Sequence, residues 1–162
     1  MANPALTRWV MASVAKYFSD TGTAASIPTL VDGLETHTEE FVSQSERAEI
    51  RVNGPYTKRM PGCENARVTI NILCSSVMGE SGKNVYGLDT TLGVFHAAAD
   101  DDIPVFKYGS EVGDDSTQIG CLKLLSGKND YVRVIKFGQL EENTRLRQGM
   151  VSATYELDVT GV

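Results

Sequence analysis

The chain has only two histidines, His37 and His96, so most schemes of acid–base chemistry would have to rest on carboxylates alone. His96 stands four residues before Asp100, so a helix that runs that far would bring the imidazole beside a carboxylate. Such a pair can serve as a general base or begin a metal site. Both uses need a nucleophile or further ligands, and none is spaced to join the pair. We therefore interpret His96 as a partnered surface or half-buried histidine, with no catalytic role.

Two other patterns could bind phosphate or metal, and neither has the required spacing. Met78–Asn84 contains Gly-Lys, but Gly79 and Gly82 are three apart and Asn84 replaces the Ser or Thr of a phosphate-binding loop. The acidic runs Asp100–Asp102 and Asp114–Asp115 lack the glycine spacing of a calcium loop, and carboxylates at a helix C-terminus favour water. We expect no catalytic residue, no cofactor and no metal site.

The three cysteines, Cys63, Cys74 and Cys121, are an odd number without a C-x-x-C pair. This spacing argues against a disulfide framework and against a thiolate zinc site, and it favours reduced thiols. Cys74 and Cys121 lie in apolar runs, where a free cysteine usually packs in the core. Cys63 lies in a Pro-Gly loop.

The bulk composition suits one soluble domain, 1–162, that can bury a core. The chain has 162 residues, 41% of them hydrophobic, and a net charge of -6. The acidic balance argues against a nucleic-acid-binding surface over the whole protein, although it leaves room for a local basic patch or an acidic wall past which DNA slides. No apolar stretch approaches the ~18 residues of a membrane span, and the N-terminus has no secretory pattern, so we expect synthesis in the cytosol.

The first half of the chain predicts a helix followed by a long hairpin. Apolar residues from Leu6 to Phe18 recur at three- and four-residue spacing, which predicts a helix over about 4–19 that ends near Gly22. The stripe includes Trp9, which we expect to dock on the sheet, with a grip on a neighbouring subunit as the alternative. The stretch 23–38 is irregular and has room for a short strand. Alternation around Ile50 and Ile72 predicts two strands over about 45–77.

The hairpin is expected to have a projecting tip. Asn53-Gly54-Pro55 should end its first strand, so that a polar loop of about ten residues, Tyr56–Asn65, joins the two strands. Lys58 and Arg59 lie in this loop. Their side chains could contact a partner subunit or DNA, or they could be charged groups in solvent with no partner role.

The second half predicts a helix, a short strand and a closing sheet. Leu88, Leu92, Phe95 and Ala99 mark a helix over about 85–99, in which Gly87 and Gly93 cost roughly 1 kcal/mol each. A strand over 103–108 and an acidic loop over 109–118 follow. The closing strands are expected at 119–125, 131–137 and 150–159, with 126–130 as a hairpin loop between the first two and 138–149 as a longer loop. The fold class is thus α+β, with a mainly antiparallel sheet and two packing helices.

Several stretches resemble one family of virion proteins. The matching stretches are Ile103–Gly109, Ile119–Leu122, Phe137–Gln139, Thr144–Leu146 and Ala153–Glu156. Together with the order helix, hairpin, helix, strand and closing sheet, they are similar to the neck, tail-terminator or tail-completion proteins of tailed bacteriophages. The resemblance covers most of the chain, is strongest after Ile103, and includes no catalytic motif.

The resemblance implies a structural protein with no enzymatic activity. Such subunits form a ring, expected to be a hexamer, that terminates the tail tube and joins it to the head connector while DNA passes through the lumen without specific binding. An acidic lumen wall would repel phosphate. Loops 54–65, 109–118 and 138–149 would make contacts between rings. Opposite charge alone suggests that Arg145 and Arg147 could pair with Asp114 and Asp115 of a neighbour, in which case reversing both arginines to glutamate should weaken assembly.

Other functions remain as alternatives. A head–tail adaptor or a tail-tube subunit would be a different virion part, and a tube subunit would use its hairpins to close a sheet. A small enzyme using His96 would need a concave pocket with a perturbed carboxylate beside that side chain. A soluble binding module would have no assembly role. The structural interpretation predicts apolar surface that only a ring can bury.

Overall fold

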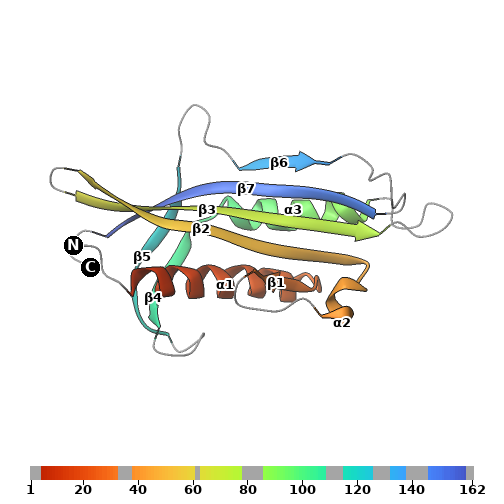
Figure 1. Cartoon of the computed structure of the whole chain (residues 1–162), viewed down its shortest axis with the longest axis horizontal. Coiled ribbons are helices and arrows are strands. Elements are labelled where there is room, and N and C mark those ends of the chain that lie inside the picture. The colour runs from red at the N-terminus through yellow and green to blue at the C-terminus, as the bar shows by residue number, and fades with distance from the viewer. Residues whose placement is uncertain are drawn as a thin grey trace.

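The computed structural model describes residues 5–32, 38–60, 63–77, 86–108, 115–125, 132–137 and 146–159. It is an α+β fold in which two long helices pack on one face of a mixed, mostly antiparallel sheet (Figure 1). In chain order the elements are α1 (Leu6–Ala24), β1 (Thr29–Val31), α2 (Glu39–Val42), β2 (Glu46–Met60), β3 (Cys63–Val77), α3 (Gly87–Ala99), β4 (Ile103–Tyr108), β5 (Asp115–Leu124), β6 (Arg133–Lys136) and β7 (Leu146–Asp158). The predicted fold class is confirmed.

The sheet runs in the order β1-β2-β3-β7-β5-β4, and β6 also pairs with β7. The hairpin β2–β3 and the strand β7 form its central part, with thirteen consecutive register pairs between β3 and β7, from Asn65↔Asp158 to Val77↔Leu146. α3 lies behind β3 and β7, and α1 lies alongside β2, where β4 also reaches it (Figure 1). α1 is thus held between β2 and β4, whereas α3 packs on the central strands and on α1.

The core forms where alternating strand residues meet the helix stripes. The apolar residues of β7 at 151, 153, 155, 157 and of the following position 159 are all buried, as their alternation predicts. The predicted stripe of α1 is buried too, including Val10, Val14 and Phe18, and Phe18 packs against Phe95 of α3 with a centroid separation of 6.4 Å. Periodicity in the sequence therefore assigned these faces correctly.

Gly22 does not end the first helix, which continues to Ala24. The chain turns at Ser26, whose φ of 58° places it in the left-handed region. The N–H of Ile27 donates to the carbonyl of Gly22 (2.8 Å), and the N–H of Ser26 donates to that of Thr23 (3.1 Å). These two bonds are the Schellman pattern, which satisfies carbonyls of the last turn. The predicted terminator is therefore the third residue from the end of the helix.

The predicted stop at Asn53-Gly54-Pro55 is also wrong, because β2 continues through it to Met60. The register with β3 shifts between Asn53 and Tyr56, where Gly54 has φ 111° and the Gly54–Pro55 peptide is cis. β1 pairs with β2 only from Ala48 to Ile50, so Pro55 lies on an edge where its missing N–H breaks no ladder bond. The expected ten-residue loop is shortened accordingly, since β3 begins at Cys63.

The closing strands lie near their predicted positions but are connected differently. β4 has the predicted bounds, β5 and β7 each begin four residues early, at Asp115 and Leu146, and β6 is shorter than expected. β5 and β6 do not form the expected hairpin around 126–130; both pair with the same edge of β7, at Tyr155–Glu156 and at Gly149–Ser152 respectively. The short loop had suggested a hairpin. Instead, each of the two strands pairs with β7, which is distant in the sequence.

Candidate assembly surfaces

The side of the central sheet that faces away from α1 and α3 is here called the open face. Strand alternation and register place its side chains, since those opposite the buried residues of β3 and β7 point outward. It carries polar pairs across strands: the Ser152 hydroxyl donates to Asn71 Oδ1 (2.7 Å), and the Thr69 and Thr154 hydroxyls share a hydrogen bond (3.2 Å). The open face is a solvated, largely polar surface of an antiparallel sheet.

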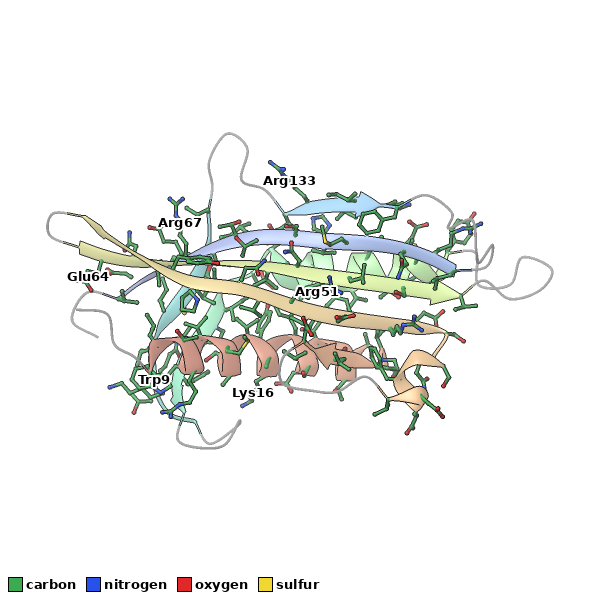
Figure 2. All side chains as sticks on the ribbon, viewed as in Figure 1. Trp9, Lys16, Arg51, Glu64, Arg67 and Arg133 are labelled. Atoms are coloured by element: carbon green, nitrogen blue, oxygen red, sulfur yellow. The ribbon has the colours of Figure 1, made fainter. Side chains whose placement is uncertain are left out.

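The open face also carries charged side chains. Arg51 and Arg133 end one row of the register, which crosses the sheet through Asn71 and Ser152. Arg67 lies farther along β3, and Figure 2 shows all three arginines on the sheet. Beside Arg67 in the register, Tyr56 is 70% exposed. These residues were not among the predicted contacts; the alternation of β2 and β3 was the signal that pointed Arg51 and Arg67 outward.

An apolar strip crosses the open face and ends at β6. Leu73, Met150 and Ile135 are register neighbours on β3, β7 and β6. Val134, Ile135 and Phe137 are each 42% exposed, and every residue of β6 is exposed. Among the described residues, no strand pairs with the other side of β6. Sequence alone did not reveal this edge, because a strand's position in the sheet depends on non-local pairing.

The backbone of β6 is also open on that side. The N–H of Phe137 donates to the carbonyl of Gln148 (2.9 Å). Because hydrogen-bonding direction alternates in an antiparallel ladder, Arg133, Ile135 and Phe137 direct their backbone groups toward β7. Val134 and Lys136 then direct theirs away from the sheet, as an edge strand does when it can accept another strand.

In the register rows that contain β6, the strand at the opposite side of the sheet, β1, is buried. Leu30 and Val31 of β1 are 2% and 1% exposed. They share register rows with Ile135 and Val134 of β6, through β2, β3 and β7. These exposed fractions include the backbone atoms. The backbone of β1 is therefore not accessible to another strand in these register rows.

Trp9 is buried within its own chain, which agrees with docking on the sheet and leaves the ring little surface for a neighbouring subunit. Its exposed fraction is 9%, and Lys107 Nζ of β4 lies 5.5 Å from the ring centroid. That distance is within the range of a cation–π contact. The residue therefore joins α1 to β4.

The charged contact candidates fall in different places. Lys58 and Arg59 lie in β2 close to the hairpin tip, opposite Asn65 and Glu64, and their side chains are outside the described residues. Asp114 and Arg145 are outside the described residues altogether. Asp115 is the first residue of β5, and Arg147 is the second residue of β7.

The ends of the sheet that carry Asp115 and Arg147 are far apart. Lys123 of β5 pairs with Glu156, nine residues beyond Arg147, which is about 30 Å along the strand. From Lys123, β5 runs back to Asp115 away from the Arg147 end. An ion pair between these two residues would have to join two subunits.

His96 is exposed and lies beside a shallow depression between α3 and β6. The depression is open to solvent and holds about 180 Å³, less than the ~300–1,000 Å³ of typical ligand pockets. Its lining residues are Asp89, Leu92, Gly93, His96, Val134 and Lys136. Lys136 forms an ion pair with Asp89. In the described part of the chain, no side-chain hydrogen bond or ion pair joins His96 to Asp100, so the His–carboxylate pair that the spacing allowed is not formed.

Cys74 is fully buried, and burial raises the pKa of its thiol to about 12. At pH 8 roughly one molecule in 10⁴ would carry the reactive thiolate. Cys121 is partly exposed and accepts a hydrogen bond from Gln118 Nε2 (3.2 Å). The side chain of Cys63 is outside the described residues.

We expect the thiol of Cys74 to react with an aromatic disulfide reagent only after the protein unfolds. In a Cys63→Ser/Cys121→Ser variant, native labelling should be at least about 100-fold slower than labelling in denaturant. The matched Cys63→Ser/Cys74→Ser variant, which keeps the partly exposed Cys121, should label faster in the native state. Equal native rates for the two variants would contradict the burial of Cys74.

The described residues contain no group of three or more His, Cys, Asp or Glu side chains placed to hold a metal ion. No helix in the described ranges is long and apolar enough to cross a membrane.

Comparison with known proteins shows a shared fold. No protein-family model matches the chain, and no curated protein matches it. A protein of known structure superposes over 93% of this chain and 94% of its own length, with a TM-score of 0.57 and 10% sequence identity. At that identity the likeness concerns the fold alone, so this arrangement of helices and curled sheet is one that another protein also adopts.

Proposed function

We propose that this chain is a ring-forming structural protein of a tailed-bacteriophage virion, which terminates the tail tube at the head–tail junction while DNA passes through its lumen. The proposal begins from the sequence resemblance. The observation that carries it is the open edge of β6, where three apolar side chains are each 42% exposed. Exposed apolar edge strands are a liability in a monomer, because they template association with other chains.

The chemistry of this edge suits strand addition by a neighbouring subunit. Val134 and Lys136 offer outward backbone donors and acceptors, and Ile135 continues an apolar strip formed with Met150 and Leu73. Main-chain hydrogen bonds would supply affinity, and the apolar strip would supply the water-excluded centre of the contact. A ring requires this contact to be head-to-tail. Because β1 is buried, β6 would then have to pair with a part of the neighbouring subunit other than β1.

The hairpin supplies a second contact of the right shape. β2 and β3 remain paired to Met60↔Cys63, whereas the β3–β7 register ends at Asn65↔Asp158. The hairpin therefore reaches past its neighbour (Figure 1). Lys58 and Arg59 lie at this end, which supports contact with an adjacent subunit or ring.

The mass of the purified protein by light scattering, with negative-stain images of the same fraction, tests the proposal. We expect a mass near six subunits together with ring images. Long tubes in place of rings would favour the tail-tube subunit, which the long hairpin and open sheet also suit. A monomer at every protein concentration, including in the presence of purified tails, would contradict a ring-forming role.

The β6 edge is tested by a pair of matched variants. Ile135→Lys places a charge in the apolar strip, and we expect it to shift the mass to that of one subunit. Tyr86→Lys changes another exposed aromatic side chain, 74% exposed at the residue before α3 and outside the apolar strip, and should leave assembly unchanged. Rings that persist in Ile135→Lys would remove β6 as the junction between subunits.

A further inference from the structure

We propose that the depression between α3 and β6 receives one apolar side chain from a neighbouring copy of this chain, carried by an extended segment that pairs with β6. The inference deepens the proposed function and rests on it, because the ring supplies the neighbouring copy. Subunits could join through β6 without any use of the depression, so the inference and the ring can fail separately.

The backbone of β6 selects the conformation of the occupant. Among the described residues no strand pairs with the outer side of β6, and Val134 and Lys136 direct their N–H and C=O groups to that side. An extended segment satisfies such groups with a ladder of main-chain hydrogen bonds, whereas a helix has already paired its own backbone groups. The occupant is therefore a strand.

The register of β6 decides where the side chains of that strand would lie. Val134 pairs with Val151 and Lys136 pairs with Gly149, and Val151 is buried on the side of β7 that faces α3 (Figure 1). Val134 and Lys136 therefore point to the α3 side of the sheet, where both line the depression. In a strand added to β6, the residue opposite Val134 would point the same way, into the space beside α3.

One face of α3 forms the other wall. The lining residues from this helix follow the i, i+3, i+4, i+7 spacing of a single face, and they are Asp89, Leu92, Gly93 and His96. A Cβ built on Gly149 would lie 2.9 Å from a methyl carbon of Leu92, whereas one built on Gly93 would meet no atom within 4 Å. Leu92 therefore packs closely on β7, while the space beside Gly93 is open.

The size and charge of the depression suit one uncharged side chain. Its volume of about 180 Å³ is below the ~300–1,000 Å³ of pockets that enclose small-molecule ligands. Lys136 and Asp89 form an ion pair with each other, so their charges offset at the rim. The remaining apolar lining, from Leu92 and Val134, favours an aliphatic or aromatic side chain, because burying apolar surface is the main gain available there.

Filling the depression from within tests the inference. Gly93→Leu places an apolar side chain in the open space, and Gly93→Ala is the matched control, because it also improves helix propensity but leaves most of the space. In light scattering over a dilution series, we expect assembly of Gly93→Leu to be at least about tenfold weaker, since the neighbour's side chain can no longer be buried. Gly93→Ala should assemble within about twofold of wild type. Neither variant should have a lower thermal midpoint than wild type, which separates the loss of assembly from a folding defect.

Val134→Thr tests the apolar character of the occupant. This substitution keeps the shape of the side chain and replaces one methyl group by a hydroxyl. We expect it to weaken assembly about fourfold, the effect of one apolar group lost from a buried contact. Assembly equal to that of wild type would overturn an apolar occupant.

The ring and the depression give separate results. Gly93→Leu rings as stable as those of wild type would overturn the inference and leave the ring standing. A wild-type dimer that never closes into a ring, and that Gly93→Leu abolishes, would support the inference and sink the ring. Binding of single subunits to purified tails, blocked by Gly93→Leu, would make a tail protein the occupant and overturn the second copy. A wild-type monomer under every condition would overturn both.

Discussion

Replacing Tyr155 by alanine is expected to lower the free energy of unfolding by about 3–5 kcal/mol, measured by urea denaturation. Among the residues that the structure describes, Tyr155 is the largest fully buried side chain, and it lies on β7 beneath the C-terminal end of α3. Its hydroxyl donates to the carbonyl of Ala99, in the last turn of that helix. The substitution therefore creates a cavity and leaves a buried helix-end carbonyl without this donor.

Tyr155→Phe separates the two contributions, because it keeps the ring and removes the hydroxyl. We expect a loss of about 1–3 kcal/mol, the cost of leaving a buried acceptor unsatisfied. Tyr17 makes a comparable bond to the carbonyl of Ala98 (2.7 Å) at a partly exposed position, so Tyr17→Phe should cost less. Equal stability of Tyr155→Phe and wild type would show that the hydroxyl bond contributes nothing.

The same tyrosines predict a loss of stability in alkali. Burial, together with Tyr17, Asp100 and Asp101, raises the pKa of Tyr155 above its ordinary 10.0. Burial and two aspartates raise the pKa of Tyr17 as well. The unfolded chain therefore loses these protons first, so the stabilisation is fully present below about pH 10 and falls as pH rises above it. Tyr155→Phe should show a shallower decline between about pH 9 and pH 11 in the urea midpoint.

Gly22→Ala is expected to destabilise the protein by about 2–3 kcal/mol. A Cβ built on Gly22 would lie 1.9 Å from Thr29 Oγ1 and 2.9 Å from the carbonyl oxygen of Ile27. The hydroxyl can rotate away, but the carbonyl belongs to the backbone that receives the chain from α1 and leads it into β1. Relief of the clash would therefore have to move that turn.

Gly93→Ala is the control, because the same substitution in α3 meets no atom within 4 Å. Alanine has the better helix propensity, so this variant should be more stable than wild type by about 0.8–1 kcal/mol. Thermal unfolding of the two variants should shift the midpoint in opposite directions. A stabilising Gly22→Ala would show that the turn after α1 can give way at no cost.

Local periodicity determined which side chains face the core. The alternation in β7 and the helical stripe in α1 predicted buried residues that the structure confirms, because a period of 2.0 or 3.6 is a property of the backbone itself. The α+β class and the bounds of β4 followed from the same patterns. Trp9 also docks inside its own chain, as its place in the stripe indicated.

The two glycine positions show where local signals mislead. Gly22 was predicted to end the helix, but the left-handed turn is made by Ser26, and the glycine serves the close approach of β1. Gly54-Pro55 was predicted to end a strand, but it forms an irregularity inside one. A proline disrupts a strand where its missing N–H would have made a hydrogen bond to a neighbouring strand. At Pro55 the strand is at an edge of the sheet, so no such bond is lost.

The candidate surfaces depended almost entirely on tertiary pairing. Sequence alternation pointed Arg51 and Arg67 away from the core, and charge pattern alone singled out Lys58, Arg59 and Arg147. The pairing of β6 with β7, more than ten residues away in sequence, decides two things. It places β6 at an edge of the sheet, and it places Arg133 on the same face as Arg51. The sequence by itself determined the periods, and hence the faces, of single elements. Only the tertiary structure decided their neighbours, because strand partners are chosen by the free energy of burying distant apolar faces together.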